Sequence, residues 1–194
     1  MLTSFQAGVR FAQAHDLRVA IKSSGHDYLG RSTAKNSLLL WTAYFKNITF
    51  KEQFIVDGSD HGPVVTVGSG VGLKTIYAAA KARGKMFVGG TAATVSPAGG
   101  YIQGAGHSAF SPIYGLAADN VHRTCFKFTF SPIRLKESLE FSVVLADGSF
   151  ATVNSASHPD CTIFSLHSVM SLTSPFLQCS GLCVGVVLVA GVFL

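Results

Sequence analysis

Residues 22–33 read KSSGHDYLGRST and place a single histidine, His26, directly after a glycine in a small polar loop. The apolar run before it, residues 17–22 (LRVAIK), predicts a strand that delivers this loop. Because glycine has no Cβ and tolerates unusual φ values, successive backbone N–H groups in such a loop can converge on an anion. We therefore interpret residues 23–27 as an anion-binding loop. The alternative interpretation of His26 is an ordinary surface-loop histidine.

A second glycine-rich stretch, residues 99–110 (GGYIQGAGHSAF), repeats the Gly-His pair at His107. Neither stretch matches the GxGxxG pattern of Rossmann domains or the GxxxxGK[ST] pattern of P-loops. We expect the two loops to hold the two ends of one extended, dinucleotide-like ligand. For His107, the alternative is a side chain that only packs or hydrogen-bonds near that ligand.

The rest of the pattern predicts a mixture of strands with few helices, which favours an α+β fold. Residues 141–154 (FSVVLADGSFATVN) predict two strands joined around Asp147-Gly148, a strong hairpin signal. Helices are expected over residues 5–15 and 73–83, the second closed by Gly84, and further strands over residues 38–44, 63–67 and 86–88.

Length and composition predict one ordinary domain, because 194 residues with 48% hydrophobic content can bury a core. The net charge of +5 arises from 15 basic and 10 acidic residues without a basic run, so nucleic acid is not expected as a partner. A positive net charge would help the protein to hold a diphosphate, because it attracts anions. All four cysteines follow residue 121, and their spacing indicates neither a metal site nor a redox motif.

Four stretches together resemble the FAD-binding domain of the vanillyl-alcohol-oxidase and para-cresol-methylhydroxylase (PCMH-type) family, especially its berberine-bridge-enzyme-like oxidases. They are KSSGHDYLGRS (22–32), VTVGSGVGLKTIY (65–77), GGYIQGAGHSAFSPIYGLAADNV (99–121) and EFSVVLADGSFATVNSASHPD (140–160). The resemblance implies a flavin domain over residues 1–160, built of two small α/β subdomains with FAD extended between them. It also implies a fragment, incomplete at its N-terminal edge and lacking the family's substrate domain.

The resemblance further implies that His26 is bonded to the 8α carbon of the flavin, a task that suits the nucleophilic nitrogen of a neutral imidazole. Ala92 stands where many relatives carry a second attachment through cysteine, so attachment through His26 alone is expected. The sequence identifies no catalytic base and no metal ligands. The implied cofactor-binding residues are Ser23, Ser24, Gly25, His26, Asp27 and Tyr28 around the diphosphate, Gly100, Gly104, Gly106, His107 and Ser108 along the flavin, Asp119 and Asn120 beyond it, and Val144 near the adenine.

The implied activity is that of an FAD-dependent oxidoreductase that oxidises an alcohol, sugar or amine carbon, passes hydride to the flavin and then electrons to dioxygen. The substrate is expected to be a small molecule, but fold resemblance does not identify it. The alternative is a catalytically inactive fragment or a membrane-anchored remnant that binds FAD. Relatives of this type are often secreted, whereas the first residues lack the pattern of a secretion signal.

Two segments depart from the family pattern. Residues 122–138 are suspected to be an insert, because their deletion would join Val121 to Leu139 in the continuous strand that the family shows. Residues 161–194 contain no Asp, Glu, Lys or Arg. We interpret this tail as the family's next stretch translated out of frame, and a membrane-like anchor is the competing interpretation.

Overall fold

The computed structural model describes residues 2–56, 58–60, 62–102, 104–117, 141–153 and 188–192. Its helices are α1 (Leu2–Ala14), α2 (Leu73–Lys81) and α3 (Ser111–Tyr114), with short helical turns η1 (Arg31–Thr33) and η2 (Pro97–Tyr101). Its strands are β1 (Val19–Lys22), β2 (Leu38–Trp41), β3 (Ile48–Lys51), β4 (Ile55–Val56), β5 (Ser59–Asp60), β6 (Val64–Val67), β7 (Phe141–Val144), β8 (Phe150–Val153) and β9 (Leu188–Val192).

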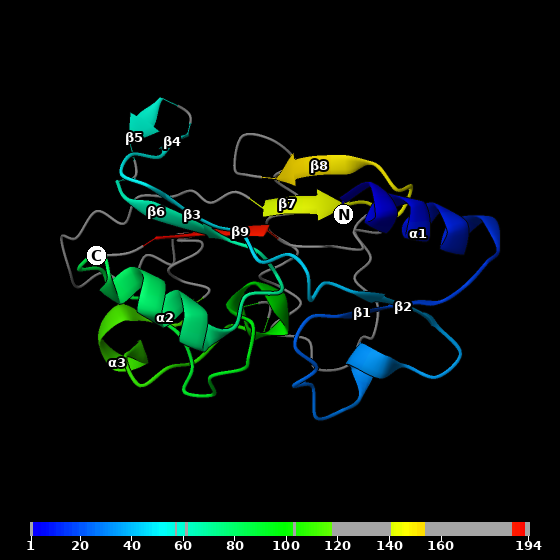
Figure 1. Ribbon diagram of the computed structural model, residues 1–194, viewed down its shortest axis with the longest axis horizontal. Helices are drawn as coiled ribbons and strands as arrows, with labels where there is room; N and C mark the ends of the chain where they lie inside the picture. The colour runs from blue at the N-terminus through cyan, green and yellow to red at the C-terminus, as the bar shows by residue number, and fades with distance from the viewer. Residues whose placement is uncertain are drawn as a thin grey trace, which may run out of the picture.

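The strands form a parallel pair, β1–β2, a five-stranded antiparallel sheet in the order β3-β6-β9-β7-β8, and a two-stranded hairpin, β4–β5 (Figure 1). In the parallel pair, Val19 lies opposite Leu38 and Lys22 opposite Trp41. Helix α1 lies beside this pair, and α2 lies beside the larger sheet. Mixed parallel and antiparallel sheets with few helices confirm the predicted α+β class.

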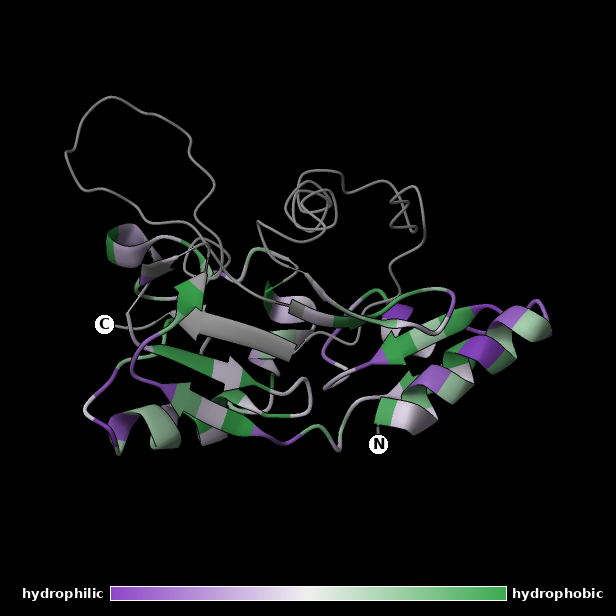
Figure 2. Ribbon diagram, turned by 90° about the horizontal axis from the view of Figure 1, so that it is seen from above, coloured by the Kyte–Doolittle hydropathy of each residue, from purple (hydrophilic) through white to green (hydrophobic). Residues whose placement is uncertain are grey.

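Helix α1 joins the two sheets. Its buried residues Phe5, Val9 and Ala12 recur at helical spacing, whereas most of its exposed residues are polar, apart from two alanines and the half-exposed Phe11 (Figure 2). From that helix, Gln6 Nε2 donates to the carbonyl of Gly148 at 2.9 Å, and Arg10 Nη2 donates to the same carbonyl at 3.3 Å. The β7–β8 turn is therefore attached to the helix that covers β2.

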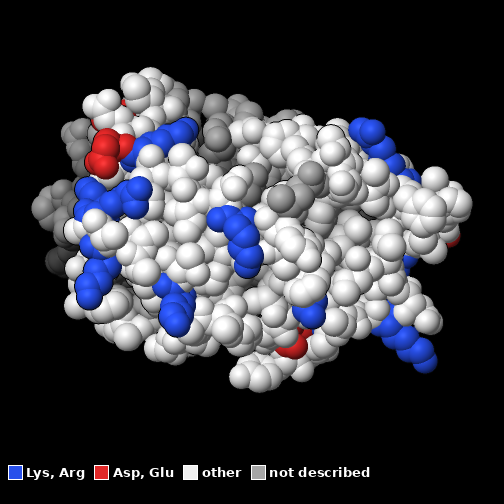
Figure 3. Space-filling model, viewed as in Figure 1, with Lys and Arg blue, Asp and Glu red and all other residues white. Residues whose placement is uncertain are grey.

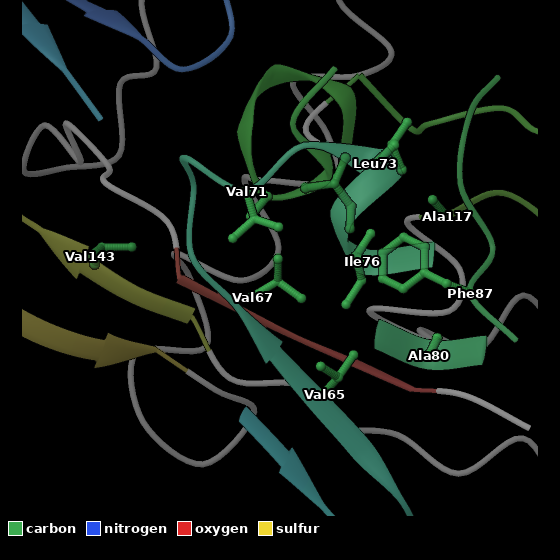
Figure 4. Packing of buried hydrophobic residues seen from close by; sticks show 11 residues of the cluster. Val65, Val67, Val71, Leu73, Ile76, Ala80, Phe87, Ala117 and Val143 are labelled. Carbon is green, nitrogen blue, oxygen red and sulfur yellow. The ribbon is translucent and has the colours of Figure 1, made fainter. Parts of the chain in front are cut away.

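The main core lies between α2 and the five-stranded sheet (Figure 4). Leu73, Ile76 and Ala80 form one buried stripe of α2, and they pack against Val65 and Val67 of β6. The predicted helix ends two residues early, at Lys81, and Gly84 follows with a left-handed φ of 64°. The complete cluster is Val65, Val67, Val71, Leu73, Ile76, Ala80, Phe87, Ala98, Ile102, Ala117 and Val143.

The strand predicted for residues 86–88 is wrong, because the backbone there pairs with no other strand. Phe87 and Val88 are buried, and the Phe87 ring packs edge-on against Tyr77 of α2 with a centroid distance of 6.1 Å. The apolar run therefore reflects packing beneath a helix. A short buried segment has the same pattern whether or not it joins a sheet.

The predicted hairpin at Asp147-Gly148 is confirmed. Strands β7 and β8 pair antiparallel with Val144 opposite Phe150, and Gly148 adopts φ 76° in the turn. The backbone N–H of Ser149 donates to Asp147 Oδ1 at 2.7 Å, which stabilises the turn.

The suspected insert, residues 122–138, and most of the uncharged tail lie outside the described residues. From the tail, β9 pairs with β6 and β7 in the larger sheet. Among the residues that the structure describes, no helix has the length and apolar character needed to span a membrane. The out-of-frame interpretation of residues 161–194 stays a prediction.

Candidate functional site

The predicted anion-binding loop follows the end of β1 and is exposed for most of its length. Gly25 has a φ of 84°, which permits the tight turn before His26. Arg31 donates from its backbone N–H to Asp27 Oδ2 at 2.6 Å and from Nε to Oδ1 at 3.0 Å. The guanidinium hydrogen bond lowers the pKa of Asp27, and the pairing compensates its charge. Tyr28, next along the loop, is fully exposed.

A lysine supplies positive charge at the base of this loop. Lys22 Nζ lies 5.0 Å from the ring centroid of Trp41, and Trp41 Nε1 donates to the carbonyl of Ser23 at 2.9 Å. The one ion pair within the described part of the chain is Asp27–Arg31, so Lys22 has no carboxylate partner there. Figure 3 shows that Lys and Arg lie across the drawn face and that acidic side chains are few. An anion beside Ser23 would meet the charge of Lys22.

Four hydroxyl-bearing residues from separate segments meet behind the loop, and we call this set the serine junction: Ser23, Thr42, Ser69 and Ser96. The carbonyl of Ser69 accepts hydrogen bonds from Ser23 Oγ at 2.6 Å, Ser96 Oγ at 2.7 Å and Thr42 Oγ1 at 3.4 Å. The backbone N–H of Ser96 also donates to Ser24 Oγ at 3.3 Å. The junction therefore joins the loop after β1 to the segment that leads into η2.

That second segment is held by the start of α2. The first N–H groups of a helix have no partners within the helix. Here the N–H of Leu73 donates to the carbonyl of Val95 at 2.9 Å, and that of Lys74 donates to the carbonyl of Ala93 at 3.0 Å. Ser96, Pro97, Ala98 and Gly99 are buried immediately afterwards. Residues 93–99 are thus held in place by hydrogen bonds to α2 and by burial, next to the first loop.

The two loops touch so closely that one position requires glycine. A Cβ added to Gly99 would lie 2.5 Å from Ser23 Oγ and 2.7 Å from Ser23 Cβ, inside the distance that real Cβ atoms keep. Gly100 beside it has open space at the same place. Glycine at position 99 therefore permits the serine junction to form.

The His26 side chain connects the loop after β1 with residues 93–99. Its Nε2 lies 2.7 Å from Thr94 Oγ1, a hydrogen bond between residues that are both exposed on the same surface. Within the described part of the chain, the imidazole makes no other hydrogen bond, so Nδ1 has no protein partner there. The histidine is thus oriented through one nitrogen, and the second is left for other chemistry.

The predicted second loop continues through a left-handed turn at Gly106, where φ is 67° and a Cβ would lie 2.7 Å from the Tyr101 ring. Tyr101 donates from its hydroxyl to the carbonyl of His107 at 2.9 Å. Burial raises the pKa of Tyr101 to about 12, so its hydroxyl stays protonated as a donor. The His107 side chain is exposed.

Ser108 closes this loop. It is buried, its Oγ accepts from the N–H of Phe110 at 3.0 Å, and its own N–H donates to Ser111 Oγ at 2.9 Å, at the start of α3. Gly104, by contrast, is exposed.

The structure therefore brings the first predicted group, Ser23 to Tyr28, onto one surface with the segment around Thr94 and Gly99. Val144 is fully buried in β7. Asp119 and Asn120 lie outside the described residues. Sequence reasoning did not assign roles to Lys22, Trp41, Thr42, Ser69, Thr94 and Ser96. For Ser69, its place in a Gly-Ser-Gly turn after a predicted strand was an available signal.

Ser69 also tests whether these residues fit an extended cofactor such as FAD. The side chain is 2% exposed, and its Oγ has no hydrogen-bond partner among the described residues. Protein interiors rarely leave such a group unsatisfied, so Ser69 Oγ is a hydroxyl that still lacks a polar partner among those residues. The positive charge of Lys22 and the exposed, left-handed turn at Gly25 suit an anionic group beside the loop after β1. The arrangement fits the diphosphate of a dinucleotide.

Comparisons with known proteins indicate FAD as the cofactor. The family described as FAD binding domain matches residues 3–125. FAD-linked oxidoreductase patO of Aspergillus clavatus is 40% identical over 156 residues, which are 80% of this chain and 24% of that protein. The crystal structure of the VAO-type flavoprotein MtVAO615 from Myceliophthora thermophila superposes with a TM-score of 0.73 at 35% identity, covering 97% of this chain and 29% of that one.

A more distant structure shares the fold at 18% identity and a TM-score of 0.67, covering 99% of this chain and 33% of the other. It is glucooligosaccharide oxidase from Acremonium strictum, which carries a 6-S-cysteinyl, 8α-N1-histidyl FAD. This chain spans about a quarter of the length of the curated relatives it matches. The match over more than half of the chain shows that it belongs to the FAD-binding domain family of VAO-type flavoproteins, with FAD as its cofactor.

Proposed function

We propose that this chain binds FAD covalently through His26 and serves FAD-linked oxidation of an alcohol, sugar or amine carbon in a small molecule, with dioxygen as the final electron acceptor. The observation that carries the proposal is the His26–Thr94 contact of 2.7 Å, which joins the first predicted cofactor loop to the segment that leads into the second and leaves Nδ1 without a protein partner in the described structure. A neutral imidazole nitrogen is a suitable nucleophile for such a bond.

The two predicted loops would bind different parts of the cofactor. The backbone of residues 23–28, with Lys22 beside it, would bind the diphosphate, and the segment from Gly99 to Ser108 would lie along the flavin. When bound, FAD supplies the acceptor for a hydride. The residues of this chain bind and orient it.

The comparisons support the oxidative class. The relatives are named as FAD-linked oxidoreductases, and the glucooligosaccharide oxidase acts on sugars by its name. Covalent histidyl attachment in that protein favours the same role for His26, while Ala92 leaves no thiol in the stretch where the resemblance places a second bond.

The test is substrate-dependent reduction of the flavin in the full chain. The purified protein is mixed without oxygen with primary alcohols, oligosaccharides and amines, and the visible flavin bands are followed. Bleaching by one class, with recovery when dioxygen is admitted, supports the proposal. Bound flavin that no class bleaches would favour the alternative, an FAD-binding remnant without catalysis. A colourless protein that binds no added FAD would contradict the proposal altogether.

A further inference from the structure

The His26–Thr94 hydrogen bond connects two backbone segments that are also held by other hydrogen bonds. On the first loop, Ser24 Oγ accepts from the N–H of Ser96, and Asp27 is bonded to Arg31 immediately after His26. His26 and Thr94 therefore both lie on hydrogen-bonded backbone, and the geometry around the imidazole is preorganised.

Thr94 itself lies between two carbonyls that are engaged by α2. Its neighbours Ala93 and Val95 accept from Lys74 and Leu73, and the N–H of Val95 donates to the carbonyl of Ala92 at 3.1 Å. The hydroxyl of Thr94 is thus presented from a backbone that is hydrogen-bonded on both sides. Such a hydroxyl selects one orientation of the ring that it contacts.

We propose that Thr94 is a positioning residue for covalent attachment of FAD, an inference that rests on the proposed function of His26. A neutral imidazole carries one N–H and one lone pair, and a hydroxyl can hydrogen-bond to either. The contact with Thr94 Oγ1 occupies Nε2 in both tautomers and leaves Nδ1 without a partner among the described residues. In the tautomer in which Nε2–H donates to Oγ1, the lone pair lies on Nδ1, and attachment proceeds from this tautomer.

Atoms and electrons balance when attachment occurs through Nδ1. The lone pair of Nδ1 would form the new N–C bond to the 8α carbon of the flavin, the proton of the C–H bond broken there would pass to water, and the electron pair of that bond would reduce the ring by two electrons. The positive charge that appears on the imidazole is stabilised by Thr94 Oγ1 until Nε2 loses its proton. Dioxygen would then accept two electrons from the reduced flavin and take up two protons, equal in number to those released by the methyl group and by Nε2, and become hydrogen peroxide.

The contact predicts different results for three variants of the same loop. Thr94→Val keeps the shape of the side chain and removes the hydroxyl, whereas Thr94→Ser keeps the hydroxyl. Thr91→Val is the matched control, because Thr91 is exposed on the same stretch and its side chain makes no hydrogen bond to the residues that the structure describes. Losing one positioning hydrogen bond should slow attachment by about tenfold.

The experiment adds FAD to the flavin-free full chain. A fast change in flavin fluorescence reports non-covalent binding, and flavin that stays with acid-precipitated protein reports attachment over time. We expect Thr94→Val to bind FAD as the unmodified chain does and to attach it about tenfold more slowly. Thr94→Ser and Thr91→Val should attach it at the original rate.

The linkage is then identified by NMR of the isolated flavin peptide. The unmodified chain should give an Nδ1 bond, and Thr94→Val a mixture that includes Nε2. Attachment by Thr94→Val at the original rate and through Nδ1 alone would overturn the role of Thr94 while leaving the proposed function intact. An unmodified chain that binds FAD but never attaches it would overturn both. Equal slowing in Thr91→Val or Thr94→Ser would also contradict the inference, because it would indicate a general effect on the loop.

Discussion

The loop after β1 and the neighbouring segment of residues 93–99 are held in place by different kinds of contact. The loop after β1 is exposed and is shaped by local contacts such as Asp27–Arg31, whereas residues 93–99 are attached to α2 and become buried from Ser96 onward. In the proposed function, the exposed loop supplies the reactive residue, His26, and the hydrogen-bonded segment beneath it supplies the rigid frame. This division lets a reactive residue face its ligand while the frame beneath it fixes its geometry.

The comparison implies that substitutions in the two loops should have separable effects. Changes to the buried segment should lower the free energy of unfolding, because side chains there have no room to move. Changes to the exposed loop should alter flavin binding or attachment and leave the fold intact.

The largest effect on stability is expected from Gly99→Ala. The new methyl group would collide with Ser23 at the serine junction, and overpacking of this kind costs about 1–3 kcal/mol. Urea unfolding measures the loss. Gly100→Ala is the matched control, because a Cβ there meets no atom within 4 Å, and its effect should stay within about 0.5 kcal/mol. Equal losses in both variants would show that the close contact between the loops is not what position 99 requires.

A smaller effect, on binding alone, is expected from Lys22→Gln. Measured in a His26→Ala background, where FAD binds reversibly, the dissociation constant should rise about fivefold, which corresponds to the loss of one charge-assisted contact of about 1 kcal/mol. High salt should narrow the difference, because it screens the charge. Riboflavin, which lacks the diphosphate, should bind both proteins alike.

Lys35→Gln removes the same charge from a nearby exposed position and serves as the control for net charge. If it weakened FAD binding as much as Lys22→Gln does, or if riboflavin binding fell in parallel, then Lys22 would not act on the diphosphate.

The smallest effect is expected from the Asp27–Arg31 pair. The pKa of Asp27 is lowered from 3.8 by its hydrogen bond to Arg31, so the ionised pair stabilises the native state above that value. This stabilisation is lost as the pH falls below 3.8 and through the lowered pKa of the folded state. Solvent screens an exposed pair, so Asp27→Asn should cost no more than about 0.5 kcal/mol at neutral pH. Thermal unfolding of the unmodified chain and of Asp27→Asn at pH 7 and pH 3 would measure this loss of stability. The difference between the two proteins should shrink at pH 3, and a difference that grows at pH 3 would contradict the prediction.

Much of the fold could be predicted from local signals. Residues 17–22 predicted a strand, and the structure places β1 within them. Asp147-Gly148 predicted the hairpin, because the turn chemistry is local. The stripe of Leu73, Ile76 and Ala80 likewise follows from helical periodicity. Residues 86–88 failed because burial beneath α2 gives the same short apolar run as a strand.

The site was only partly accessible to the same reasoning. His26 was predicted as the attachment residue because a histidine in a glycine loop and a family resemblance coincide on one residue. The contact of Thr94 with His26 and the three bonds to the carbonyl of Ser69 depend on segments far apart in the chain. Hydroxyl residues are common in loops, so no local pattern distinguishes those that meet.

The most direct test of the central claim compares the unmodified chain with His26→Ala after saturation with FAD and acid precipitation. The account predicts a yellow, fluorescent pellet from the unmodified chain, and a colourless pellet with all flavin in the supernatant from His26→Ala. Because neither loop depends on the imidazole for its backbone contacts, both proteins should show the same unfolding midpoint. Flavin retained in the His26→Ala pellet, or released completely by the unmodified chain, would contradict covalent attachment through His26.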